Sequence, residues 1–170
     1  MNKKKRCFPQ HFHLLKHLIQ VSHSLKLLWL TKTRIHSNSK IMFTLEQIEN
    51  AHSKMKSGAD FHVYIKELKN LGVISYDCFV SNGHTGFCGS DDFKVESPAL
   101  YETLNIARQA NHEQFSADLK AHQLGKTNYL TFCADCAKSG ISKWKVDTIK
   151  MTCTYYDTEQ NNILEEKIPE

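Results

Sequence analysis

The chain has 170 residues, enough for one domain whose core needs no disulfides. Its formal net charge of +4 is unevenly spread: residues 1–40 hold nine of the 22 lysines and arginines and none of the 18 acidic residues, so residues 41–170 carry a net charge of −5. An acidic body argues against a general nucleic-acid binder, which needs a basic surface.

The basic segment, residues 1–41, differs in composition from the rest of the chain. Its leucines fall near helical spacing, which is compatible with a cationic amphipathic helix. The alternative is that the natural start is Met42 and that the upstream bases are translated in frame. Lysines and histidines interrupt every apolar run, so the segment predicts neither a signal peptide nor a membrane span. We expect a disordered tail or a mis-assigned start at 1–41 and a single domain at 42–170.

The six cysteines follow no secretion signal, so a cytoplasmic protein with free or metal-bound thiols is expected. Within the domain, two short helices come first. Thr44 and Gln47 have the spacing of a capping box for the first helix. Asp60 is placed to cap a second helix that ends at Gly72, and Asn111 a third that ends at Gly125.

The remaining segments are rich in β-branched and aromatic residues and predict strands. A turn at residues 81–83 (SNG) joins the first two. Helices followed by strands, with one helix inserted, predict an α+β fold: a small two-layer sandwich whose mainly antiparallel sheet is covered by helices on one face. The predicted strands are 73–80, 84–89, 93–95, 101–107, 129–132, 144–150, 151–156 and 163–168.

Several blocks of sequence resemble one known family in the same order. They are residues 43–48 (FTLEQI), 76–83 (YDCFVSNG), 129–133 (YLTFC) and 144–147 (WKVD). They resemble the YdfO/YbcV-like prophage family, whose members are sometimes labelled "phage envelope protein". The resemblance covers residues 42–170 and implies a small two-layer α/β sandwich, but it implies no mechanism and no catalytic residues.

Cys133 and Cys136 form a CxxC pair, which the strand prediction places in a turn. Two thiolates at this spacing can share one tetrahedral zinc ion, although one pair supplies only half a structural site. The best candidates for the other half are His84 and Cys88, on a glycine-rich loop. A zinc-stabilised module built on these four residues is therefore one hypothesis.

The same residues allow three other interpretations. CxxC after a strand also occurs in thiol–disulfide redox proteins, but Gly140 leaves little room for the helix that lowers the first thiol's pKa. His84 and Cys88 could form a nucleophile pair, although no neighbour is expected to orient the histidine. The remaining interpretation is that the thiols are structural and that the histidine is incidental.

Since no catalytic constellation emerges, the leading hypothesis is a prophage-derived, non-enzymatic module that binds an unknown protein partner and modulates the host. The aromatic residues of the predicted strands are expected to pack the sheet; any on an open face would suit protein docking. His52 and His122 fall on the apolar faces of their helices and are expected at the edge of the core. The aromatic residues are Tyr76, Phe79, Trp144, Tyr155 and Tyr156.

Overall fold

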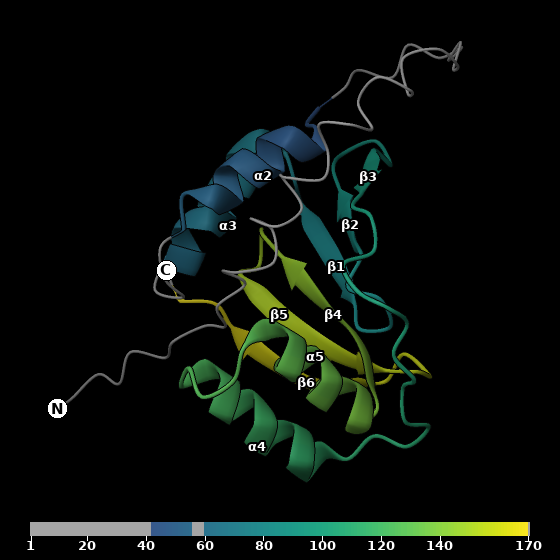
Figure 1. Cartoon of the computed structure of the whole chain (residues 1–170). Helices are drawn as coiled ribbons and strands as arrows, with labels where there is room; N and C mark the ends of the chain where they lie inside the picture. Colours follow the sequence, from purple (N-terminus) through teal and green to yellow (C-terminus); the bar gives the residue numbers. More distant parts are fainter. Residues whose placement is uncertain (1–41, 56–59, 170) are drawn as a thin grey trace, which may run out of the picture.

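The computed structural model describes residues 42–55 and 60–169, so the basic segment at 1–41 lies outside the described residues. Four helices and six strands make up the described chain (Figure 1). This confirms the predicted α+β class. In chain order they are α2 (Leu45–Ser53), α3 (Phe61–Leu71), β1 (Ser75–Phe79), β2 (Thr85–Cys88), β3 (Lys94–Glu96), α4 (His112–Gln123), α5 (Tyr129–Lys138), β4 (Ile141–Asp147), β5 (Thr152–Asp157) and β6 (Asn162–Lys167).

Three of the predicted helix signals are confirmed, whereas Asp60 stands at the N-cap position of α3 without a side-chain cap hydrogen bond. Thr44 and Gln47 form the reciprocal capping box of α2, with N–O distances of 2.8 and 3.2 Å between each backbone N–H and the other side chain. Gly72 ends α3 in the left-handed conformation. The Asn111 side chain accepts the backbone N–H of Gln114 at the start of α4.

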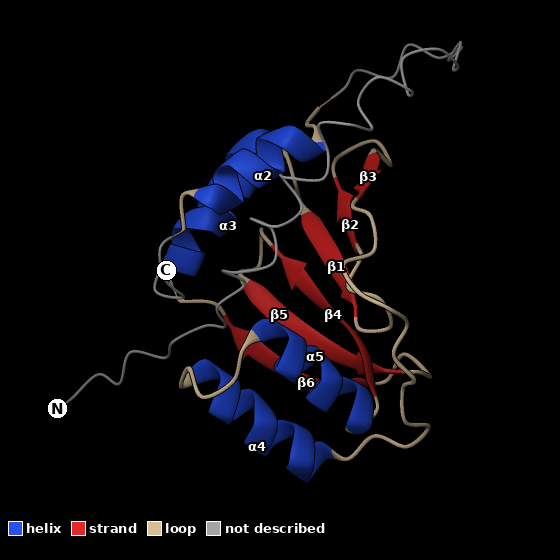
Figure 2. Ribbon diagram, viewed as in Figure 1, coloured by secondary structure: helices blue, strands red, loops and turns tan. Residues whose placement is uncertain are grey.

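The six strands form one antiparallel sheet in the order β3-β2-β1-β4-β5-β6. Figure 2 shows α2 and α3 together near one end of the sheet and α4 and α5 together near the other. Buried residues of both pairs belong to one core cluster with Tyr76, Trp144 and Tyr155, which share one face of the sheet. Phe115 of α4 packs on Tyr155, and Phe132 of α5 packs on Trp144, with ring centroids 4.9 and 5.8 Å apart. The core therefore lies between this face and the helices.

Strand residues alternate between this core face and the opposite face of the sheet. On β4, Trp144 and Val146 are buried in the core, whereas Lys143 and Lys145 point the other way and are half-buried. No described helix packs on that opposite face, which we call the open face. One register of β4 thus sets the composition of both faces.

The strand expected at 101–107 was wrong, because this segment is an irregular connection between β3 and α4. Its backbone bonds to a turn instead of to a sheet edge. Leu100 and Leu104 donate to the carbonyls of Asn82 and Ser81, at 2.8 and 2.7 Å. The Tyr101 hydroxyl donates to the Val80 carbonyl at 3.0 Å. These contacts fix the connection against the β1–β2 turn.

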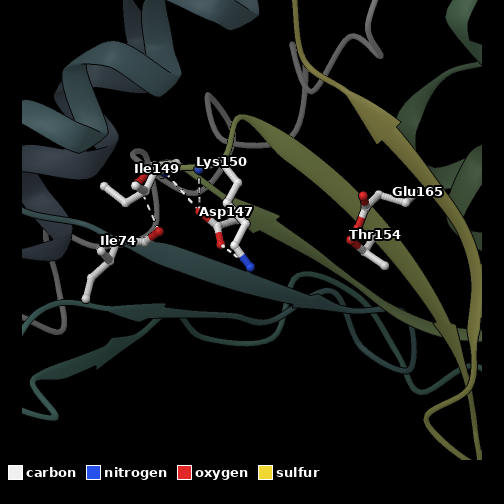
Figure 3. Close-up of polar contacts among 7 residues, drawn as sticks. Ile74, Asp147, Ile149, Lys150, Thr154 and Glu165 are labelled. Carbon is white, nitrogen blue, oxygen red and sulfur yellow. Dashed lines mark hydrogen bonds and ion pairs between the residues drawn. The ribbon is translucent and has the colours of Figure 1, made fainter.

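The turn between β4 and β5 is held from both sides (Figure 3). The Asp147 carboxylate accepts the backbone N–H groups of Ile149 and Lys150 at 2.9 and 2.8 Å. The buried Thr148 hydroxyl bonds to the carbonyls of Val73 and Ile74, at 2.7 and 2.9 Å. This links the end of β4 to the start of β1.

Gly140 permits the close approach of the 97–111 connection to the start of β4. Its φ is +76°, and a Cβ there would lie 2.5 Å from the Gln109 carbonyl oxygen. Gly125 has a similar φ of +73°, but a Cβ there would meet no atom within 4 Å. An alanine at either position would have the same backbone strain, but only an alanine at 140 would also overlap other atoms. Comparing the two substitutions therefore separates the cost of strain from the cost of overlap.

We predict that Gly140→Ala destabilises the fold more than Gly125→Ala. Gly125→Ala, the control, should lower the free energy of unfolding by about 1 kcal/mol, the cost of a left-handed backbone at a residue with a Cβ. Gly140→Ala should cost at least about 2 kcal/mol more, because backbone atoms must shift. Urea unfolding of both variants measures the difference; equal losses would contradict the close contact.

Candidate functional site

The CxxC pair lies on a helix, so the strand predicted at 129–132 and the turn after it were wrong. The Asn128 side chain accepts the Thr131 N–H at 2.9 Å and caps α5. The buried residues of α5 recur at the three- and four-residue intervals of one helix face. They are Tyr129, Phe132, Cys133, Cys136 and Ala137.

Both thiols are fully buried against the core face of the sheet. Burial raises the pKa of Cys133 to about 11, although its hydrogen-bonding contacts with the hydroxyl groups of Tyr101 and Tyr129 act in the opposite direction. Burial raises the pKa of Cys136 well above its usual value, and the neighbouring Cys133 adds to this. Cys133 is the fifth residue of α5 and lies beyond the first turn, where a helix N-terminus stabilises thiolates. The surroundings of Cys133 and Cys136 therefore keep both thiols protonated and disfavour reactions that need a thiolate.

Two further buried thiols share this region of the core. Cys78 of β1 lies 3.3 Å from the Thr85 hydroxyl, and burial raises its pKa. Burial also raises the pKa of Cys153 on β5, to about 12. The nearby Cys153 and Cys133 raise the pKa of Cys78 further, and Cys133 and Cys153 do the same for Cys136. The five described cysteines are all free. Four of them therefore act as small apolar packing residues.

The structure does not bring the four predicted zinc ligands together. Cys133 and Cys136 lie on the core side of the sheet. Cys88 pairs with Ser75 on the open face, and His84 stacks on Phe79 of the same face. Among residues 42–55 and 60–169, no group of three or more His, Cys, Asp or Glu side chains is arranged to hold a metal ion. The zinc hypothesis therefore gains no geometric support.

His84 and Cys88 are also far from each other. His84 comes just before β2 and Cys88 is its last residue, and four residues of extended chain span roughly 13 Å. His84 is nevertheless oriented, which the sequence did not predict. Its Nδ1 lies 2.6 Å from the Asn82 Oδ1, an acceptor, so Nδ1–H is the donor of this hydrogen bond. The ring lies parallel to Phe79, with centroids 4.2 Å apart.

A row of aromatic and basic side chains crosses the open face on β1, β4 and β5, with one further member in the turn before β2. We call it the lysine–aromatic strip: Phe79, His84, Lys143, Lys145 and Tyr156. Pairing places Lys143 between Phe79 and Tyr156. The Lys143 ammonium lies 6.0 Å from the Phe79 ring centroid and 5.3 Å from that of Tyr156, within the range of cation–π attraction.

Lys143 and Lys145 differ in their partners. The Lys143 ammonium forms an ion pair with Asp77 on β1 at 3.3 Å. Lys145 lies between Asp77 and Thr154 in the next row of the sheet, yet the ion pairs of the described residues do not include it. Thr154 donates instead to Glu165 at 3.0 Å (Figure 3). Lys145 is thus a half-buried cation available to an external anion.

Two histidines belong to the core side instead of the strip, as expected: His122 is buried and His52 is half-buried. His122 stacks on Phe132 with ring centroids 4.3 Å apart, and its Nδ1 bonds to Thr127. His52 packs edge-on against Tyr64. Burial lowers the pKa of each imidazole to about 4. Both rings are therefore neutral in the folded protein at neutral pH.

The family model of DUF1398, a family of proteins of unknown function, matches residues 49–167, so the chain belongs to this family. A comparison with curated proteins found no match. No helix within 42–55 or 60–169 combines the length and apolarity that crossing a membrane requires. The family assignment implies no particular activity, and the resemblance to prophage proteins stays a prediction.

We predict that Cys88 reacts with iodoacetamide faster than Cys133 and Cys136 in the folded protein. Cys88 is half-exposed, whereas the α5 thiols are buried and held protonated by their raised pKa. Mass spectrometry of digests taken during labelling at mildly alkaline pH measures each rate. Denatured protein, in which all the thiols should react alike, is the control. Faster labelling of Cys133 would contradict the packing role.

A second prediction concerns pH. Each histidine has a pKa of about 4 when folded and about 6.5 when unfolded, so the unfolded chain binds more protons between these values. The free energy of unfolding should be constant with respect to these groups above pH 6.5 and fall as the pH drops toward 4. Urea unfolding at a series of pH values measures this.

The matched control is His122→Phe, which keeps a ring on Phe132. This variant should lose the part of the pH dependence that His122 contributes and keep the part from His52. An unchanged pH profile in this variant would contradict a buried neutral His122.

Proposed function

We propose that this protein is a non-enzymatic module, prophage-derived and cytoplasmic, that modulates the host by binding a protein partner on its open sheet face. The observation that carries the proposal is the lysine–aromatic strip. Its aromatic rings, lysine stems and one unpaired cation lie on the face that no described helix covers. The prophage origin rests on the sequence resemblance.

The composition of the strip favours protein over nucleic acid as the partner. Aromatic side chains are common contact anchors in protein interfaces. Nucleic-acid platforms instead leave their rings free for base stacking within a strongly positive groove. Here His84 already covers one face of Phe79, and Asp77 neutralises Lys143. The domain as a whole is acidic.

The available cation defines the chemistry of the contacting surface. Lys145 is half-buried near the centre of the sheet and has Thr154 beside it. A carboxylate from the partner would replace its hydration with a charge-assisted hydrogen bond. Tyr156 offers a ring and a hydroxyl next to the same position. We therefore expect a partner segment that combines Asp or Glu with an apolar side chain.

The test is site-specific photo-crosslinking in lysogenic cells with the full chain. A photoreactive phenylalanine analogue at Tyr156 or Phe79 should capture the same protein, whereas the analogue at Glu102, on the connection before α4, should not. Binding of the purified partner should then weaken at least tenfold on Lys145→Glu, since attraction becomes repulsion.

The control variant is Lys126→Glu, which makes the same charge change at an exposed position outside the sheet. Unchanged binding by Lys145→Glu would place the interface elsewhere. Catalytic turnover by the purified protein, abolished by one substitution, would overturn the non-enzymatic proposal.

A further inference from the structure

The two edges of the sheet differ in their capacity to pair with another strand. β3 has three residues, whereas β6 has six, and no described strand pairs with its outer side. The hydrogen bond from Ile168 to the Met151 carbonyl, 2.8 Å long, fixes which backbone groups face β5. Counting back by twos, the even-numbered residues bond to β5, and Glu165 and Lys167 direct their N–H and C=O groups outward.

The side chains of these two outward-directed residues carry opposite charges on the same face. Glu165 and Lys167 pair with Thr154 and Thr152 of β5, so both lie on the open face and both are exposed. A strand of identical sequence, running antiparallel and centred on Glu166, would place Glu165 of each copy opposite Lys167 of the other. Each of these residue pairs could also exchange two backbone hydrogen bonds.

We infer that the outer edge of β6 pairs with β6 of a second copy of this chain in the register centred on Glu166, forming a twofold dimer with a continuous sheet. This inference is independent of the proposed function, because it rests on the edge and not on the strip.

The charges select this register over its neighbours. Centring the pair on Glu165 would oppose two carboxylates, and centring it on Lys167 would oppose two ammonium groups; both are unfavourable. If the second strand were shifted by one residue, the outward-directed N–H and C=O groups of Glu165 and Lys167 would face residues of the other copy whose backbone groups already bond to β5. Pro169, which has no N–H, ends the ladder on each side.

One contact in this register is repulsive and is already compensated within each copy. Glu166 of one chain faces Glu166 of the other on the core side of the sheet. The Gln123 side-chain amide donates to both oxygens of Glu166, at 3.0 and 2.8 Å, and directs this carboxylate toward α4. Glu165 receives the Thr154 hydroxyl on one oxygen and keeps its other oxygen for Lys167 of the second copy.

The dimer has a consequence for the open face. Because the twofold axis would run perpendicular to the sheet, both lysine–aromatic strips would lie on the same side. Two strips on one rigid surface could engage a partner with two copies of the same segment.

The test is native mass spectrometry and sedimentation of the full chain over a wide concentration range. The unmodified chain should dimerise. Lys167→Glu and Glu165→Lys should each weaken the dimer about tenfold or more, because each replaces two attractive pairs by two repulsive ones. The double exchange Glu165→Lys with Lys167→Glu should restore it, since the opposite charges meet again.

The matched control combines Glu102→Lys with Lys126→Glu, two exposed positions outside the sheet; it should leave the dimer unchanged. Hydrogen exchange supplies a site-specific readout: the amides of Glu165 and Lys167 should slow as concentration rises. A monomer at all concentrations would overturn the inference. So would a dimer that is indifferent to both single exchanges or not restored by the double one.

Discussion

The alternation of side chains along β4 is the constraint on which the rest of this structure depends. Trp144 and Val146 are directed into the core, so Lys143 and Lys145 must emerge on the other side. A shift of one residue in register would bury two lysines and expose a tryptophan. Since β4 is paired on both sides, its register also sets which residues of β1 and β5 share each face.

The described helices cover only one face of the sheet, so they add to the difference between the core face and the open face. Phe132 and Tyr129 of α5 contact Trp144, and Phe115 of α4 contacts Tyr155. The thiols of α5 enter the same interior and pack with tyrosine hydroxyls around them. What resembles a metal or redox motif in the sequence is, in the fold, one stripe of a core-facing helix.

The sequence predicted the elements whose signals are local. The capping box at Thr44, the glycine at position 72 and the cap at Asn111 lie where expected, and each of the six observed strands overlaps a predicted one. The overall α+β class followed from their order. These signals depend on backbone chemistry within a few residues of each other, which a sequence shows directly.

The failures had a different physical origin. Tyr129, Thr131 and Phe132 favour strands by propensity, but tertiary packing decided in favour of the helical period of Phe132, Cys133 and Cys136. Asn128 was the cap signal that could have revealed α5. The separation of His84 and Cys88 from the CxxC pair depends on which sheet face each occupies, and the ion pair of Lys143 with Asp77 depends on strand register. Neither can be derived from residue spacing alone.

In this fold the CxxC pair consists of two free, buried thiols that pack a core-facing helix, and the proposed binding function is assigned to the open face. Nuclear magnetic resonance of the full, isotope-labelled chain tests this packing role most directly. A buried helix with free thiols should give helical Cα shifts throughout 129–138 and Cβ shifts of Cys133 and Cys136 typical of protonated thiols. Strand-like shifts before Cys133, or Cβ shifts typical of a disulfide or of zinc ligation, would contradict it.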